Sequence, residues 1–262
     1  IRILRACDEM QIRTVAIYTH EDRYSLHRYK ADESYCIGAE DEPLKPYLDI
    51  QEIISLAKSK NVDAIQPGYG FLSENADFAR ACEANGITWV GPKPDSMEKL
   101  GNKVSAKLLA IEAGLPIIQS NTTPLINAET ALEEAKRIGF PVMLKAASGG
   151  GGRGMRIIRK EDELAHNFEN ASREALNAFG DGTIFIEKYV ENPKHIEVQI
   201  CADNFGNMVH LFERDCSVQR RFQKVVEVAP AWSLKTQTRE KLYEYALAIC
   251  RKADYTNVGT VE

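Results

Sequence analysis

The sequence has few cysteines and no arrangement of them that would hold a metal ion. Six are spread over 262 residues, without a C-x-x-C pair or a Cys/His group of zinc spacing. They lie in apolar stretches, so we expect free, buried thiols, with a disulfide pair as the alternative. Free thiols are typical of a reducing compartment, and we therefore expect a cytoplasmic protein.

Long apolar runs and a dominant charge are also missing. No stretch reaches the roughly 20 apolar residues of a membrane span, and no signal-peptide pattern opens the chain. The net charge of −5 and the pI near 5.7 offer no broad basic surface. We therefore expect an ordinary globular chain with no nucleic-acid partner and no membrane partner.

The two ends of the sequence lack the usual signs of a start and a stop. There is no initiating methionine, and IRILRACDEM begins inside a helical pattern. At the other end, VGTVE has the composition of an unfinished strand. We expect a fragment of a longer chain, cut at both ends.

The first third of the chain alternates short apolar strands with helices. The strands are expected at residues 15–18, 34–37, 64–66 and 88–90, and the clearest helices at 50–58 and 76–85. This alternation predicts an α/β domain with a parallel sheet, covering residues 1–97. The segment GPKPDS at 91–96, rich in proline and glycine, is the expected boundary.

The remaining residues, 98–262, predict an α+β domain. Helices are expected at 103–113, 128–138, 162–178 and 237–252. From Phe140 onward, strands follow one another with few helices between them: PVMLKA, MRIIR, TIFIEKYV, HIEVQIC and MVHLFER. Successive strands of this kind indicate antiparallel pairing.

The sharpest local signal is SGGGGRGMR at 148–156. Glycines allow backbone N–H groups to approach an anion closely. A dinucleotide-binding loop would need a helix after Gly154, but MRIIR predicts a strand, and no G-K-[ST] closes a Walker loop. The pattern favours a hairpin flap over nucleotide phosphates, with a ligand-free hairpin as the alternative. A protein kinase would also need D-F-G, which is absent.

Polar residues around this flap could complete an anion site. Lys145 ends the apolar run before the flap, where its ammonium could reach phosphate. Lys103 lies in GNK at a helix start, and the sequence alone favours neither a phosphate contact nor a solvated surface lysine there. His195 and Glu197 share one face of a strand, which is equally compatible with a polar outer surface. The cations of QRRFQK at 219–224 indicate either a compact anion site or a solvated loop paired with Glu213 or Asp215.

Taken in order, seven motifs resemble the biotin carboxylase domain of biotin-dependent carboxylases over essentially the whole chain. They are HRYKADESY, PGYGFLSEN, GNK, MLKAASGGGGRGMR, EKYVENPKHIEVQI, ERDCSVQRRFQKVVEVAP and VGTVE. The first and sixth are most similar to the bacterial-type pyruvate carboxylases. A carboxylase component for acetyl-CoA or another acyl-CoA is the alternative.

The resemblance implies an ATP-grasp domain after a Rossmann-like N-terminal domain, with a lid at about 117–190. It implies an ATP-dependent ligase in which bicarbonate attacks the γ-phosphate of ATP, giving carboxyphosphate whose carbon dioxide is captured by biotin. The implied cofactors are ATP, magnesium or manganese, and biotin carried covalently on a separate domain. The implied partners are bicarbonate, the biotin carrier domain, a carboxyltransferase domain that converts pyruvate to oxaloacetate, and further copies of the chain in a homo-oligomer.

Carried over residue by residue, the resemblance implies a set of phosphate contacts. Lys103 and Lys145 match the lysines of the family that bind phosphate. Gly151 and Gly152 match the flap glycines that cover the phosphates.

The same comparison implies contacts to the rest of the nucleotide. Glu187, Lys188 and Val190 match the segment that holds adenine. His195 and Gln219 match contacts to the ribose and the nucleotide.

Two further positions are implied at the reacting end. Lys224 matches the catalytic lysine near bicarbonate, and Glu262 matches the first carboxylate ligand of the metal. Gln66 and Phe222 stand where the family usually has histidine. Phenylalanine cannot form a side-chain hydrogen bond, so any nucleotide contact at Phe222 would be apolar or stacking.

Other classes of protein remain to be distinguished. Another ATP-grasp ligase, of the carbamoyl-phosphate type, would also activate bicarbonate but would not require biotin. A nicotinamide oxidoreductase needs a helix after Gly154. A module that only binds nucleotide would show no turnover.

Overall fold

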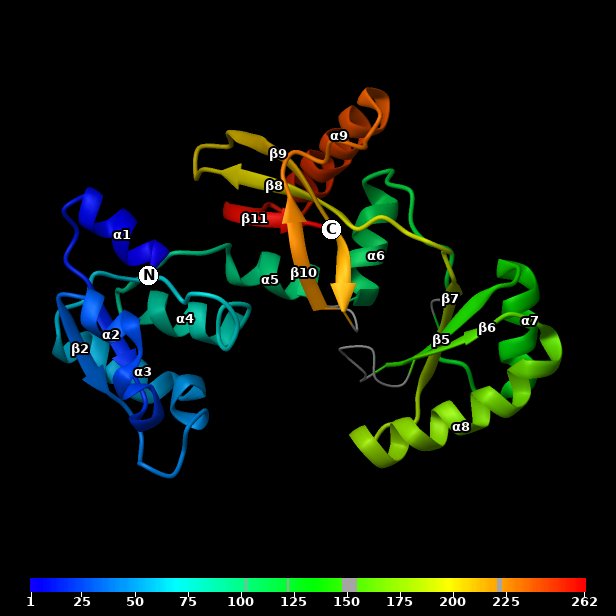
Figure 1. Cartoon of the computed structure of the whole chain (residues 1–262), viewed down its shortest axis with the longest axis horizontal. Helices are drawn as coiled ribbons and strands as arrows, with labels where there is room; N and C mark the ends of the chain where they lie inside the picture. Colours follow the sequence, from blue (N-terminus) through cyan, green and yellow to red (C-terminus); the bar gives the residue numbers. More distant parts are fainter. Residues whose placement is uncertain (102, 122, 148–154, 221–222) are drawn as a thin grey trace. The chain divides into compact units, whose positions relative to one another are not determined.

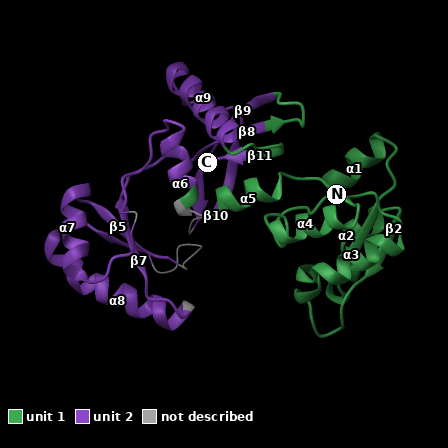
Figure 2. Ribbon diagram, turned by 180° about the vertical axis from the view of Figure 1, so that it is seen from behind, with its two compact units in different colours: residues 1–105, 201–207, 253–259 green, residues 106–200, 208–252, 260–262 purple. Residues whose placement is uncertain are grey.

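The computed structural model describes residues 1–101, 103–121, 123–147, 155–220 and 223–262. The chain forms two compact units, coloured separately in Figure 2. The first contains residues 1–105 with two short later segments, 201–207 and 253–259. The second contains residues 106–200, 208–252 and 260–262.

The first unit carries parallel strand pairs flanked by helices, as the alternation in the sequence predicts. Strand β1 pairs in parallel with β2, and β3 pairs in parallel with β4. Two 3-10 turns, η1 (His20–Tyr24) and η2 (Lys45–Leu48), lie between these elements. The helices and strands are α1 (Arg2–Glu9), β1 (Val15–Tyr18), α2 (Leu26–Lys30), β2 (Glu33–Cys36), α3 (Ile50–Ser59), β3 (Ala64–Ile65), α4 (Ala76–Ala84), β4 (Thr88–Trp89) and α5 (Pro94–Gly101).

Local side-chain chemistry sets the helix starts in this unit. The carboxylate of Asp49 accepts the N–H of Glu52 at 2.9 Å, which caps α3. Asn75 caps α4 in the same way through the N–H of Phe78 at 2.8 Å. The expected boundary at 91–96 overlaps the start of α5, because Pro94 suits the first position of a helix.

In the described part of the chain, the second unit contains most of α6, the helices α7, α8 and α9, and two sheets, labelled in Figure 1. One sheet has the order β6-β5-β7 and the other β10-β9-β8-β11. β11 and one end of β8 also contribute residues to the first unit. The elements are α6 (Lys103–Glu112), α7 (Ala128–Ile138), β5 (Val142–Ala146), β6 (Met155–Ile158), α8 (Glu161–Phe179), β7 (Ile184–Lys188), β8 (Ile196–Ala202), β9 (Met208–Arg220), β10 (Gln223–Val228), α9 (Thr236–Lys252) and β11 (Asn257–Val261).

The three-stranded sheet has one buried face and one half-buried face. Both β6 and β7 pair antiparallel with the central strand β5. Helices α7 and α8 cover one face (Figure 1), where Val142, Leu144 and Ile186 are fully buried. Because side chains alternate along a strand, Lys145 and Glu187 emerge on the opposite face.

The outer edge of β7 is covered by the chain segment that leads into α7. The N–H of Lys188 donates to the carbonyl of Gln119 at 2.8 Å, and the N–H of Leu125 donates to that of Ile184 at 3.1 Å. Between them, the buried side chain of Asn121 accepts the N–H of Ile186 at 2.7 Å. Residues 119–121 and 123–125 therefore lie along this edge in the manner of a short, irregular fourth strand.

The cysteines meet the expectation in part. All six are free, and Cys82, Cys216 and Cys250 are buried. Cys36 is exposed, so the expectation of burial is wrong for it. It ends β2, an edge strand of the two-stranded sheet that the described residues form with β1. Within the described part of the chain, no helix combines the length and apolar character needed to cross a membrane.

Candidate nucleotide and metal site

Lys145 and Glu187 form an ion pair on the open face of the β6-β5-β7 sheet. In the register of β5 and β7, Lys145 lies opposite Phe185 and diagonal to Glu187. The Lys145 ammonium contacts one carboxylate oxygen of Glu187, and Lys107 Nζ lies 3.7 Å from the other. Lys145 and Glu187, both implied for nucleotide binding, are thus brought together, and Lys107 of α6 adds a second positive charge beside Glu187.

Lys188 and Val190, implied beside adenine, have different surroundings. The Lys188 ammonium donates to the carbonyls of Gly139 and Phe140, both at 2.9 Å. These carbonyls follow the last turn of α7, so the cation caps the negative end of that helix. Val190 lies beyond β7 and is exposed. Two of the three ammonium donors of Lys188 are thus bonded within the chain.

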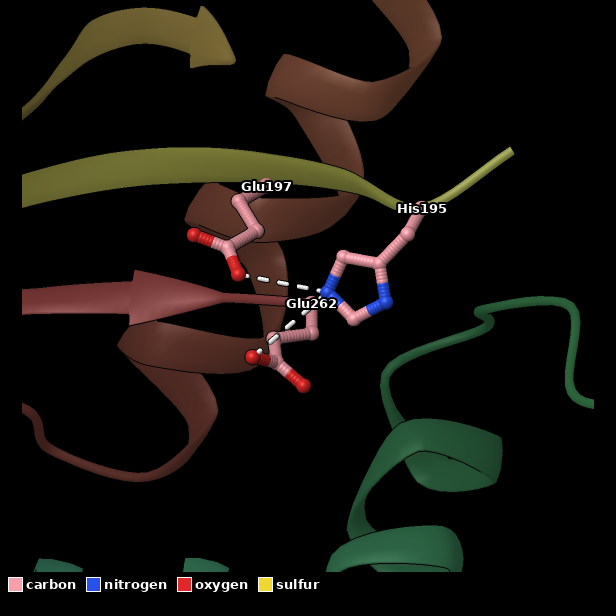
Figure 3. A group of neighbouring side chains, drawn as sticks. All are labelled: His195, Glu197 and Glu262. Carbon is pink, nitrogen blue, oxygen red and sulfur yellow. Dashed lines mark hydrogen bonds and ion pairs between the residues drawn. The ribbon is translucent and has the colours of Figure 1, made fainter. Parts of the chain in front are cut away.

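Glu197 is the centre of a second cluster, in the sheet β10-β9-β8-β11. Its side chain is only 2% exposed. Arg214 of β9 donates from Nε at 2.8 Å to one oxygen, and His195 Nε2 lies 3.2 Å from the other. Lys224 of β10 contacts both Glu197 and Glu262, so a single ammonium joins two carboxylates. Figure 3 shows His195, Glu197 and Glu262 pointing toward one another.

The charges of this cluster are fixed by their neighbours. Burial would raise the pKa of the Glu197 carboxyl, but the bonds from Lys224 and the charge of Arg214 outweigh it and lower the pKa to about 2. Burial would likewise lower the pKa of Lys224, but the two carboxylates raise it above its ordinary value. Glu197 is therefore an anion and Lys224 a cation at neutral pH.

The cluster offers ligand atoms for a metal ion. One ligand atom from each of His195, Glu197 and Glu262 lies within 4.8 Å of the others. Both oxygens of Glu197 already contact cationic side chains, whereas Glu262 is 55% exposed and can turn outward. Magnesium prefers oxygen ligands and retains water readily, so Glu262 fits as one protein ligand beside phosphate oxygens and water. His195 is a nitrogen ligand and suits this ion less well.

The described residues of the segment at 219–224 lie in two paired strands, 219–220 in β9 and 223–224 in β10. Gln219 lies in β9 and pairs with Lys224 in β10, while its amide donates to the Cys216 carbonyl at 3.0 Å. The alternative is a solvated loop paired with Glu213 or Asp215, and a loop is wrong for the described residues of the segment. Glu213 is buried and bonds Arg239, Tyr243 and the N–H of Ala231 instead.

Several implied contacts lie outside the described residues. Gly151, Gly152 and Phe222 are among them, as is most of the glycine-rich segment. Lys103 begins α6, and its backbone alone is described. On either side of the glycines, β5 and β6 pair antiparallel, so the residues after Gly154 form a strand. This contradicts the helix that a nicotinamide-binding loop requires.

Sequence reasoning weighed Glu197 without selecting it and did not select Arg214 or Lys107. The alternation of HIEVQ placed Glu197 on the face of His195. Its cationic partners come from β9 and β10, and no periodicity within one strand predicts which strands pair. Lys107 carried no signal, because a lysine on a helix is usually solvated.

Comparison with known families agrees with this geometry. Residues 1–97 match the family "Biotin carboxylase, N-terminal domain". Residues 102–262 match "Carbamoyl-phosphate synthase L chain, ATP binding domain". The chain therefore belongs to the biotin carboxylase family, with the family's N-terminal domain followed by its ATP-binding domain. The resemblance inferred from the seven motifs is confirmed, and so is the predicted fold class.

Within that family, the relatives found include pyruvate carboxylases. The pyruvate carboxylase of Staphylococcus aureus is 53% identical over 262 residues, covering 100% of this chain but 23% of the relative. The human mitochondrial pyruvate carboxylase is 51% identical, with 100% and 22% covered. The chain thus spans under a quarter of the length of these relatives.

Solved structures give the same result. A biotin carboxylase–β-γ-ATP complex from Campylobacter jejuni matches with a TM-score of 0.89 and 45% identity, over 99% of this chain and 58% of that one. The biotin carboxylase domain of Hydrogenobacter thermophilus 2-oxoglutarate carboxylase, a dimer with MgADP, ADP and bicarbonate, matches at 0.88 and 47%, over 99% and 57%. Pyruvate carboxylase from Rhizobium etli matches at 0.86 and 51%, over 99% and 23%.

Proposed function

We propose that this chain performs the ATP-dependent carboxylation of biotin within a carboxylase of the pyruvate type. The observation that carries the proposal is Lys224, whose ammonium lies between the buried Glu197 and the exposed Glu262. A fixed cation for a small anion and a carboxylate suited to a metal ion are thus adjacent. That pairing is what joining bicarbonate to a phosphoryl group requires.

The roles of the residues follow from their charges. Because its pKa is raised, Lys224 remains protonated and would hold bicarbonate and the carboxyphosphate anion by charge, without acting as a base. Glu197 would hold Lys224 and His195 in place. Glu262 would hold magnesium or manganese, which when bound neutralises charge on the phosphates. Lys145 would contact those phosphates from the open face of the other sheet.

The proposal extends to the whole protein. The pyruvate carboxylases that match over this entire chain are more than four times as long, which supports a separate biotin carrier domain and a carboxyltransferase domain. The dimer named for the 2-oxoglutarate carboxylase supports a homo-oligomer. We also place the protein in the cytoplasm. The similarity to the 2-oxoglutarate carboxylase makes 2-oxoglutarate a second candidate for the molecule that is carboxylated, beside pyruvate.

The test is ADP release by the intact natural protein, measured with and without bicarbonate and biotin. We expect release to require both, and Lys224→Gln to lower kcat/KM by about a hundredfold or more. Lys252→Gln is the matched control, because Lys252 pairs with Glu112 at 3.2 Å on another part of the unit. Carboxylation assays with pyruvate, 2-oxoglutarate and acetyl-CoA then identify the acceptor.

Two results would contradict the proposal. ATP cleavage that is indifferent to biotin would indicate a ligase of the carbamoyl-phosphate type. MgATP binding without turnover under any of these conditions would indicate a module that only binds nucleotide.

A further inference from the structure

The carboxylate of Glu187 has two cationic neighbours, one for each oxygen. Lys145 contacts the first oxygen, and Lys107 Nζ lies 3.7 Å from the second. Lys145 comes from the neighbouring strand β5, while Lys107 comes from helix α6. Glu187 is 19% exposed, so these charges interact more strongly than a solvated pair does.

Lys107 is positioned independently of Lys145. Its ammonium donates to the Ser120 hydroxyl at 2.9 Å. Ser120 lies opposite Glu187 of β7 as a backbone bridge partner, so this pairing places both the hydroxyl and the carboxylate beside Lys107. Removing Lys145 from the pair would therefore leave the contact between Lys107 and Glu187 in place.

The two cations have different tasks if Lys145 binds phosphate, as the proposed function requires. Glu187 and a phosphate group are both anions, and they compete for the Lys145 ammonium. A carboxylate that loses its partner in a half-buried site is destabilised and also repels the incoming phosphate. A second cation that remains on the carboxylate offsets both effects.

We propose that Lys107 is a positioning residue for ATP binding, because it retains Glu187 when Lys145 turns to the nucleotide. This inference rests on the proposed function but adds a residue that does not itself touch the nucleotide. Its effect passes through Glu187, which distinguishes it from a general contribution of positive charge.

The experiment measures MgATP affinity and ATP kinetics in the intact natural protein. Lys107→Met keeps the length of the side chain and removes its charge, and we expect Kd and KM for MgATP to rise about fivefold. We expect kcat at saturating ATP to change little, and Lys107→Arg to restore affinity. Where Glu187→Gln is already present, Lys107→Met should have no further effect, because no carboxylate remains to be held.

Lys136→Met is the matched control, since Lys136 makes an exposed ion pair with Glu161 at 2.9 Å. An unchanged Kd in Lys107→Met would overturn this inference alone. An equal loss of affinity in the Glu187→Gln background would also overturn it, because Lys107 would then contact the nucleotide directly. Failure of the unaltered protein to bind MgATP would overturn the proposed function together with this inference.

Discussion

Lys145 owes its environment to strand alternation. Its neighbours Leu144 and Ala146 point into the core, so the charged side chain must emerge on the other face, where Glu187 meets it. A lysine inside an apolar run is unusual enough to be noticed in the sequence. Its partner is not readable there, because the partner depends on the register between β5 and β7.

Replacing Lys145 by glutamine tests its proposed contact with phosphate. The loss of one charge-assisted hydrogen bond in a partly dry site costs roughly 1.5–3 kcal/mol. We therefore expect kcat/KM for ATP to fall by about one to two decades. Steady-state kinetics of the intact protein measure this, with Lys136→Gln as the control. Normal affinity and turnover in Lys145→Gln would remove the residue from the site.

Glu197 illustrates what a single sequence leaves undetermined at this scale. HIEVQ could equally form the polar outer face of a strand, and it carries no sign that residue 197 is buried. Burial follows from Arg214 and Lys224, which neutralise the carboxylate from two other strands. Both are distant in sequence, so the cluster becomes visible only after the strand order is known.

At the scale of elements, periodicity located most helices and strands to within a residue or two. The sequence leaves the segment at 219–224 open between an anion site and a solvated loop. Its residues 223 and 224 begin β10, whose residues are all exposed and show no alternation between buried and exposed positions. Without that alternation, composition alone cannot distinguish a strand from a loop.

Helix α7 provides a prediction about stability. The carbonyls of Gly139 and Phe140, just beyond its last turn, accept from Lys188 of β7, so the helix end is bonded by another element. Lys188→Met should lower the free energy of unfolding by about 1 kcal/mol, through the lost bonds and the lost charge at the helix end. Chemical denaturation measures the change, and Lys188→Arg should recover part of it. If Lys188→Met and Lys136→Met were equally stable, the cap would contribute nothing.

At the scale of the whole molecule, the buried carboxylate of Glu197 makes the free energy of unfolding depend on pH. Glu197 has a pKa of about 2 in the folded chain, against an ordinary value of 4.5. As pH falls below 4.5, the unfolded chain takes up the proton first. The stability that Glu197 contributes is therefore present above pH 4.5 and is lost toward pH 2.

The pH dependence can be measured directly on the intact protein. We expect its unfolding free energy to decline from about pH 5 to pH 2, and Glu197→Gln to reduce proton uptake on unfolding by up to about one proton. Denaturant titrations at a series of pH values provide the slope. Glu161→Gln is the control, because Glu161 is exposed at the start of α8. A slope unchanged by Glu197→Gln would mean that this carboxylate is not held ionised by its neighbours.

The segment that runs beside β7 has a consequence for association between molecules. An open sheet edge presents donors and acceptors that recruit strands from other chains, which is a common route to aggregation. Here the N–H groups of Ile186 and Lys188 are already bonded to Asn121 and Gln119. The other edge strand in the order is β6, whose Arg156 is paired with Glu174 of α8 at 2.8 Å. The chain's own lead-in to α7 thus closes the β7 edge of this sheet to edge-to-edge growth.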